Sequence, residues 1–196
     1  MPKGTEGAYD RAMSSLEKVT ILVLEDNSHM ALILREIMRG FGLRDIREAR
    51  DAATAFEIIK DNHIDIALVD QNLGDLDGTE FVQLIRNADD SPNPYIQIIM
   101  VTAHGDRKTV MESLRAGANE FMVKPVTPMD LYKKLVSCID KPRQFVRTST
   151  YFGPDRRRRQ DSTYRGPWRR KNDPPEGINE SGEKVGKGNR PTVIEG

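Results

Sequence analysis

The chain has 196 residues, with 30 Asp+Glu balanced by 30 Lys+Arg. That neutrality hides a division, because residues 1–140 carry 16 Lys+Arg against 23 Asp+Glu, whereas residues 141–171 carry 11 Lys+Arg against two Asp. A single cysteine excludes an internal disulfide. No apolar run approaches the ~20 residues that cross a bilayer, and the N-terminus lacks a signal-peptide core. We therefore expect a cytoplasmic protein without a membrane span, with an acidic domain and a basic tail.

Short apolar runs alternate with longer amphipathic stretches up to about residue 141. Continuous apolar runs are typical of buried strands, and apolar residues that recur every three or four positions indicate helices. Ser28 is predicted to cap the first helix, and Gly40 and Gly42 are predicted to end it. After residue 142 aliphatic residues nearly vanish, which indicates that no second core forms.

The strands predicted in this way are Val19–Leu24, Asp45–Ala49, Ile64–Val69, Tyr95–Val101 and Glu120–Val123. The predicted helices are Ser28–Phe41, Ala52–Lys60, a segment through Phe81, Leu84 and Ile85, Asp106–Ala116 and Pro128–Ile139. Strands that alternate with helices favour a parallel sheet with helices on both faces. The predicted fold class is therefore α/β.

Polar residues follow four of the predicted strands. They are Glu25 and Asp26, then Asp70, Thr102 and Lys124. In an open parallel sheet the carboxyl ends of the strands share one edge, where ligands bind. We therefore expect three carboxylates, one hydroxyl and one ammonium group to lie close together there.

Three neighbouring carboxylates repel one another unless a cation lies among them. Carboxylate oxygens without His or Cys nearby suit a hard ion, and Mg²⁺ is the usual one in phosphate chemistry. Asp70 could then act as a carboxylate nucleophile towards a phosphoryl group. The plainer interpretation is that acids after strands are helix caps and solvated loop residues, which is reasonable for Glu25 or Asp26 taken singly.

The set Glu25-Asp26, Asp70, Thr102-Ala103 and Lys124-Pro125 resembles the receiver domain of two-component response regulators. The loop from Asp70 to Gly78 is similar to the phosphorylation loop of that family. The resemblance implies a doubly wound, flavodoxin-like sheet of order 2-1-3-4-5. It covers a receiver domain at 19–141, after an N-terminal lead-in at 1–18. Composition predicts that residues 142–196 are a basic, then Gly- and Pro-rich, largely disordered tail.

Carried over residue by residue, the resemblance implies that Asp70 accepts the phosphoryl group. The implied Mg²⁺ ligands are Asp26 and Asp70 directly, Glu25 through water and the backbone carbonyl of Asn72. The implied phosphoryl contacts and switch positions are Thr102, Ala103, Lys124 and Phe121. A cis peptide bond is expected before Pro125. Phe121 could instead be a static core aromatic, and His104 either a solvated loop residue or one that orders a water.

The resemblance further implies a sensor histidine kinase or phosphotransfer protein as the phosphoryl donor. Self-phosphorylation and self-dephosphorylation would be the only catalysis, so no conventional enzyme is expected. A downstream protein would bind the surface of the fourth helix, fifth strand and fifth helix, around Lys108–Ile139. A homodimer that forms on phosphorylation is a further partner that the sequence leaves open.

The tail contains a doubled motif, in which Tyr151-Phe-Gly-Pro-Asp-Arg-Arg-Arg matches Tyr164-Arg-Gly-Pro-Trp-Arg-Arg-Lys. Its basic residues are Arg156, Arg157, Arg158, Arg159, Arg169, Arg170 and Lys171. These side chains could neutralise nucleic-acid phosphates while the aromatic residues stack on bases. Anionic lipid, the acidic domain itself and no partner at all are the alternatives.

Two functions of different classes therefore remain at this stage. The first is a phosphorylation switch with Asp70 as the acceptor. The second is an unphosphorylated receiver-like module whose arginine-rich tail binds nucleic acid or a partner protein. Intact residues at the positions of Asp70, Thr102 and Lys124 favour the first.

Overall fold

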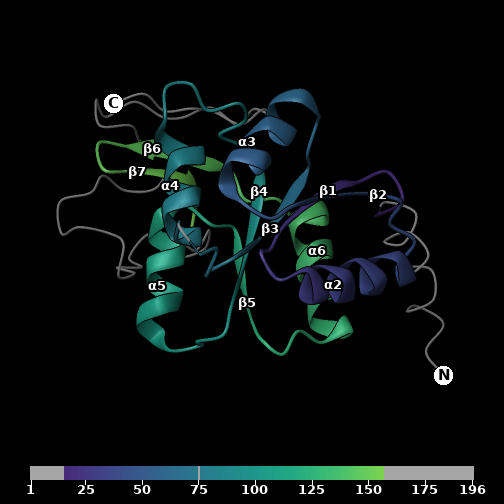
Figure 1. The fold of residues 1–196 in the computed structure, drawn as a ribbon. Helices are drawn as coiled ribbons and strands as arrows, with labels where there is room; N and C mark the ends of the chain where they lie inside the picture. The colour runs from purple at the N-terminus through teal and green to yellow at the C-terminus, as the bar shows by residue number, and fades with distance from the viewer. Residues whose placement is uncertain (1–15, 75, 157–196) are drawn as a thin grey trace, which may run out of the picture. The chain divides into compact units, whose positions relative to one another are not determined.

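The structure is a computed structural model that describes residues 16–74 and 76–156 (Figure 1). In these residues five parallel strands form one sheet: β1 (Thr20–Leu24), β2 (Asp45–Ala49), β3 (Ile66–Asp70), β4 (Gln97–Thr102) and β5 (Glu120–Val123). The helices that alternate with them are α2 (Ser28–Gly40), α3 (Ala52–Asp61), α4 (Gly78–Asn87), α5 (Arg107–Ala116) and α6 (Pro128–Asp140). The strand order β2-β1-β3-β4-β5 confirms the predicted doubly wound fold.

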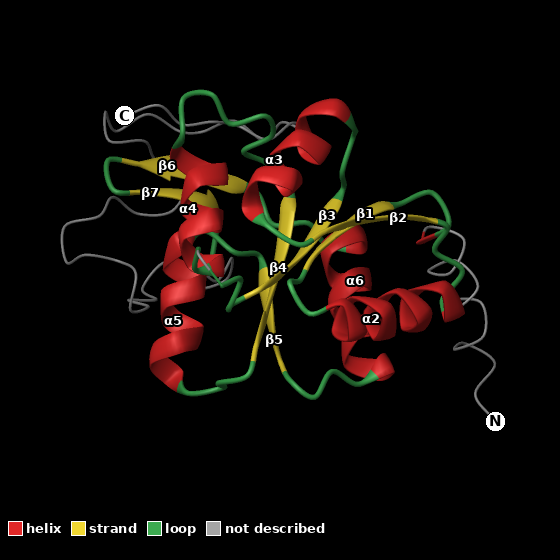
Figure 2. Cartoon of the chain, viewed as in Figure 1, coloured by secondary structure: helices red, strands yellow, loops and turns green. Residues whose placement is uncertain are grey.

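Helices cover both faces of this sheet. Figures 1 and 2 show α2 and α6 on one face and α3, α4 and α5 on the other. Alternate residues of each strand point to opposite faces, so Ile21 and Val23 join the core under α2 and α6, while Leu22 and Leu24 join the core under α3 and α4. Every residue of β3 is buried. Burial on both faces explains why the central strands are almost continuously apolar.

The register of the strands sets which polar residues meet at the carboxyl edge. β3 lies between β1 and β4, and Asp70 at its end is aligned with Val101. Thr102, the next residue of β4, is aligned with Val123 of β5. The residues that follow β1, β3, β4 and β5 therefore emerge at the same edge of the sheet.

The structure departs from the sequence expectations at three local points. The N-cap of α2 is Asn27 and not Ser28, because the Asn27 side chain accepts hydrogen bonds from the backbone N–H groups of His29 and Met30. Both residue types cap helices well, so residue preference alone does not predict which of the two is the N-cap. Leu16, assigned to the lead-in, is fully buried in the core. Tyr95 precedes β4 and is exposed.

A second unit begins after Pro142, and its described residues form an antiparallel hairpin of β6 (Phe145–Thr148) and β7 (Tyr151–Pro154). The Phe145 and Phe152 rings lie 5.7 Å apart, and the Arg147 guanidinium lies 4.1 Å from the centre of the Phe152 ring. The sequence predicts no regular structure here. Each strand has only four residues, so its apolar alternation is too short to indicate a strand from the sequence. The aromatic and β-branched residues in these strands are nevertheless types that favour β structure. Residues 157–196 lie outside the described part of the chain.

Candidate functional site

A tight turn after β3 brings the end of that strand against the start of α4. The backbone N–H of Gly78 donates to the carbonyl of Gln71 at 2.9 Å, and Asn72 and Asp77 form an isolated bridge. A Cβ atom at Gly78 would clash with the backbone carbonyl oxygen of Asp70 and lie 2.9 Å from Cε of Met100. Asp77 supplies the N-cap of α4 as part of a capping box. The Asp77-Gly78 pair therefore shapes the loop that carries Asp70.

Three carboxylates gather at the carboxyl edge of the sheet. Glu25 and Asp26 follow β1, and Asp70 ends β3. One oxygen from each of the three lies within 4.8 Å of the others. Glu25 and Asp70 are buried, whereas Asp26 is exposed. The structure therefore brings together the three acids that the sequence predicts to be neighbours.

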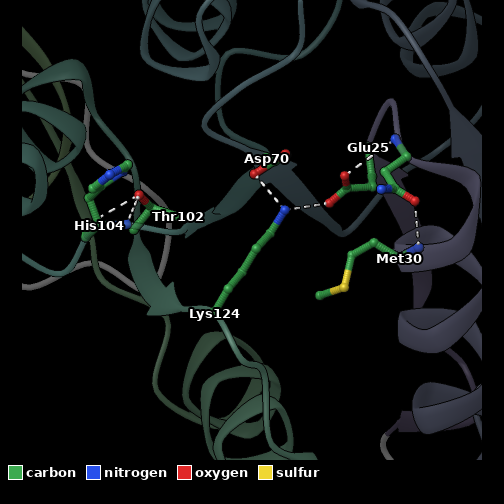
Figure 3. A network of polar contacts seen from close by, with 7 residues as sticks. Glu25, Met30, Asp70, Thr102, His104 and Lys124 are labelled. Carbon is green, nitrogen blue, oxygen red and sulfur yellow. Dashed lines mark hydrogen bonds and ion pairs between the residues drawn. The ribbon is translucent and has the colours of Figure 1, made fainter.

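The side chain of Lys124 extends from the end of β5 between two of these acids (Figure 3). Its Nζ lies 3.0 Å from Oε2 of Glu25 and 3.0 Å from Oδ1 of Asp70. The backbone N–H of Lys124 donates to the Thr102 carbonyl at 2.7 Å, which aligns β5 with the end of β4. The peptide bond between Lys124 and Pro125 is cis. The ammonium group thus balances part of the negative charge that the fold concentrates at this edge.

Burial and charge shift the protonation of this cluster. Burial raises the pKa of Glu25, and the Asp70 charge raises it further, against the opposing effect of the Lys124 hydrogen bond. Burial alone would lower the pKa of Lys124, but its hydrogen bonds to Glu25 and Asp70 outweigh burial and raise it. Lys124 therefore stays charged near neutral pH, while the Glu25 carboxylate lacks full compensation.

The donor set fits a hard divalent cation. Carboxylate oxygens are the ligands that Mg²⁺ prefers, and no His or Cys joins this group in the part of the chain that the structure describes. The pKa of Glu25 is raised first by burial and further by the nearby Asp70 charge, and the contacts with Lys124 do not fully offset these two effects. A cation among Glu25, Asp26 and Asp70 would remove that imbalance. Asn72 is exposed in the turn that follows Asp70.

The hydroxyl group of Thr102 is held by the loop that follows β4. Its Oγ1 accepts a hydrogen bond from the backbone N–H of His104 at 3.0 Å and lies 3.3 Å from the His104 carbonyl (Figure 3). Thr102 is buried, whereas Ala103 and His104 are exposed. The small side chain at Ala103 leaves the edge of the sheet open on this side.

Phe121 lies on β5, three residues before Lys124. Its ring is partly buried against the core under α3 and α4, and Nζ of Lys134 lies 5.5 Å from the ring centre. The same Nζ forms an ion pair with Oε2 of Glu120 at 2.7 Å. Lys134 belongs to α6, so the contacts of this lysine connect β5 to that helix.

Sequence reasoning missed two residues with extensive polar contacts. The side chain of Gln71, directly after Asp70, contacts the start of α4 and one residue of α5. Arg86 in α4 is buried, although its position in an amphipathic helix gives no sign of it. A polar residue directly after the aspartate that ends the strand was the available signal for Gln71, whereas Arg86 carried none.

The basic tail is only partly described. Arg156 follows the hairpin and is half-buried. The other predicted basic positions, Arg157, Arg158, Arg159, Arg169, Arg170 and Lys171, lie outside the described residues. Among residues 16–74 and 76–156, no helix has the length and apolar character that crossing a membrane requires.

Comparison with known families gives a match to the response regulator receiver domain over residues 21–136. Among curated proteins, the chain is 30% identical over 119 residues to the chemotaxis protein CheY-3 of Vibrio cholerae, covering 61% of this chain and 90% of that protein. It is 34% identical over 116 residues to the chemotaxis protein CheY1 of Helicobacter pylori, covering 59% of this chain and 92% of that protein.

Solved structures show the same fold. A response regulator from Chloroflexus aurantiacus has a TM-score of 0.58 and 27% identity, covering 63% of this chain and 98% of that one. The receiver domain of a sensor histidine kinase from Pseudomonas aeruginosa, which has a magnesium ion coordinated in its active-site cleft, has a TM-score of 0.54 and 26% identity. That match covers 62% of this chain and 96% of the Pseudomonas domain. All four matches leave about two fifths of the chain uncovered.

Proposed function

Because the chain belongs to the family of response regulator receiver domains, we propose that it accepts a phosphoryl group on Asp70 from a histidine kinase or phosphotransfer protein. Members of this family are signalling proteins and not conventional enzymes. The observation that carries the proposal is Lys124, whose Nζ lies 3.0 Å from the buried Asp70 carboxylate at the open edge of the sheet. The receiver domain occupies residues 19–141 in this proposal.

The chemical step is a transfer between two nucleophiles. An oxygen of Asp70 attacks phosphorus and forms an acyl phosphate, while the P–N bond of a phosphohistidine donor breaks and the imidazole leaves with the electron pair. A Mg²⁺ ion held by Glu25, Asp26, Asp70 and the Asn72 carbonyl would supply positive charge for the phosphoryl oxygens. Lys124, whose Nζ contacts Asp70 at 3.0 Å, would exchange that contact for one with the new phosphoryl group.

The switch that follows uses Thr102 and Phe121. The Thr102 hydroxyl leaves its contacts with His104 and bonds a phosphoryl oxygen, which opens space beside β4. The ring of Phe121, on the neighbouring strand, turns into that space and gives up its contact with Lys134. The face of α5, β5 and α6 then changes for a downstream protein, or for a second copy of the chain.

The test is labelling with a small phosphodonor, acetyl phosphate, in the presence of Mg²⁺. Intact-mass spectrometry is expected to show one added phosphoryl group, and Asp70→Asn is expected to abolish it. A control is Asp51→Asn, which makes the same substitution at an exposed aspartate and keeps a good N-cap for α3. Absence of labelling in the wild-type protein, or labelling of Asp70→Asn, would contradict the proposal.

The basic tail has a separate proposed role as a binding segment for nucleic acid. Residues 141–171 carry 11 Lys+Arg against two Asp, so electrostatic attraction to phosphates would dominate the affinity. In the described hairpin, Arg147 already stacks on the Phe152 ring, an arrangement that a nucleobase can extend.

Binding through phosphates has a characteristic salt dependence. The affinity for a single-stranded oligonucleotide is expected to fall by about 10³-fold or more between 50 mM and 200 mM salt if six or more phosphates are neutralised. Deleting residues 157–171 is expected to abolish binding, measured by fluorescence anisotropy. Deleting residues 172–196, which carry more acidic than basic side chains, is the control and should leave affinity at least unchanged. Salt-independent retention would count against the role.

A further inference from the structure

Gln71 makes the most extensive set of side-chain contacts next to Asp70. It follows Asp70 directly, at the point where β3 ends. Its backbone is held on both sides, because its N–H donates to the Val101 carbonyl at 2.8 Å and its carbonyl accepts from the Gly78 N–H at 2.9 Å. These two hydrogen bonds restrict the backbone dihedral angles of Gln71, so a displacement of the Asp70 backbone also moves Gln71.

The side-chain amide of Gln71 uses both of its functional groups. Nε2 lies 2.7 Å from Oδ1 of Asp77 and 2.9 Å from Oγ1 of Thr79, so its two protons are directed at the first turn of α4. Oε1 lies 3.4 Å from the hydroxyl oxygen of Ser113, which donates to it from α5. One planar amide thus joins the end of β3 to two helices.

Ser113 is the residue of α5 that Gln71 contacts. It is buried within α5, and its hydroxyl has a single proton. That proton has two acceptors within reach, the Thr109 carbonyl of its own helix at 3.0 Å and Oε1 of Gln71 at 3.4 Å. A small movement of the amide towards or away from α5 therefore changes which acceptor the proton prefers, because hydrogen bonds weaken as the distance lengthens.

We propose that Gln71 is a positioning residue that couples the phosphorylation state of Asp70 to helix α5 through Ser113. This connection rests on the proposed phosphoryl acceptance at Asp70. It differs from the switch of Thr102 and Phe121, because it starts at the end of β3 and reaches α5 directly, without β4 or β5. When the phosphoryl group forms and the end of β3 adjusts, the Gln71 amide moves with it and shifts the hydrogen bonding of Ser113.

The experiment compares hydrogen exchange of the α5 amides in the full-length chain with and without acetyl phosphate and Mg²⁺. Gln71→Met keeps the size of the side chain and removes its hydrogen bonds. We expect it to label at Asp70 like the wild type, while the phosphorylation-induced change in α5 exchange falls about three-fold or more. Gln83→Met, the same substitution at an exposed position of α4, is the matched control and should keep the full change.

Variants at Ser113 and Thr79 address the ends of the connection. Ser113→Ala is expected to reproduce the loss, and the double variant with Gln71→Met should lose no more than either single variant, because the two residues act as one unit. Ser113→Thr keeps the hydroxyl and should therefore retain the phosphorylation-induced change in α5 exchange that Ser113→Ala loses. Thr79→Val removes one acceptor of the amide and should give a partial loss without altering a buried position.

The outcomes separate this inference from the proposed function. If the wild-type protein does not label, the function and the coupling both fail. If the wild type labels but Gln71→Met keeps the full response of α5, the coupling through Gln71 is wrong and the phosphoryl acceptance stands. A loss in Gln83→Met equal to that in Gln71→Met would also overturn the coupling, because the effect would not depend on the Gln71 contacts.

Discussion

At the scale of single residues, the carboxylate cluster is a compromise between folding and metal binding. Glu25 is buried beside Asp70, and Lys124 is the ammonium group that contacts both. Concentrating carboxylates costs folding free energy, yet the same concentration prepares a site for a divalent cation. The raised pKa of Glu25, which is caused first by burial and further by the charge of Asp70, reflects this cost.

The raised pKa predicts a pH dependence for the metal-free protein. Because folded Glu25 binds its proton more tightly than unfolded Glu25, the contribution of this group to stability is greatest below pH 4.5, the ordinary pKa. It is lost as pH rises through the raised folded value. Glu25→Gln, which stays neutral, is therefore expected to be more stable than the wild type at pH 7 in EDTA, with the advantage shrinking towards pH 4.

Urea denaturation at a series of pH values checks this expectation. Adding Mg²⁺ should stabilise the wild type at pH 7 by binding to the folded state and should stabilise Glu25→Gln less. A variant that is less stable than the wild type at pH 7 in EDTA would contradict the assignment of Glu25 as an insufficiently compensated charge.

At the scale of elements, Arg86 ties α4 to segments that sequence periodicity does not connect to it. Nη1 donates to the Pro94 carbonyl at 2.7 Å and Nη2 to the Ile96 carbonyl at 2.8 Å, just before β4. Nε donates to the Gly117 carbonyl at 3.0 Å, at the end of α5. These bonds give donors to backbone carbonyls in the segments that precede β4 and follow α5.

Replacing Arg86 by Met should therefore destabilise the fold strongly. The variant removes the donors of three carbonyl hydrogen bonds, two of them buried, and we expect a loss of about 3 kcal/mol in the free energy of unfolding. Arg39→Met is the control, because Arg39 is exposed on α2 and its pair with Glu36 is solvated. That change should alter stability by less than about 0.5 kcal/mol. Equal effects in the two variants would show that Arg86 is not a structural connection.

At the scale of the whole molecule, the chain divides at Pro142. The described residues up to Pro142 form one compact unit, and the hairpin belongs to another. The two apolar cores that cover the sheet are built from residues 16–138. We therefore expect a protein ending at residue 142 to fold alone and to label at Asp70 as the full chain does.

Truncation at residue 142 tests this division directly. The urea midpoint of the short protein should lie close to that of the first transition of the full chain, and intact-mass spectrometry should show one phosphoryl group on each. An unfolded short protein would mean that the second unit completes the fold of the first.

The sequence was sufficient for the layout of the first unit. Its alternation of apolar runs and amphipathic stretches predicted five strands and five helices, because each period reports which residues are buried. The order of the sheet followed only from the resemblance to receiver domains. It also named the polar residues at the strand ends, from Glu25 to Lys124. It did not reveal the hairpin at Phe145–Pro154, whose few apolar residues stand among arginines.

Only the tertiary structure decided which of these residues touch. Lys124 bonds Glu25 across 99 positions of sequence, and Gln71 meets Ser113 across 42. Arg86, a charged residue in an amphipathic helix, is buried because carbonyls from two distant loops converge on it. Periodicity in the sequence indicates only which face of an element is buried. A hydrogen bond depends on atomic positions to within a few tenths of an ångström, and strand register and helix packing together determine those positions.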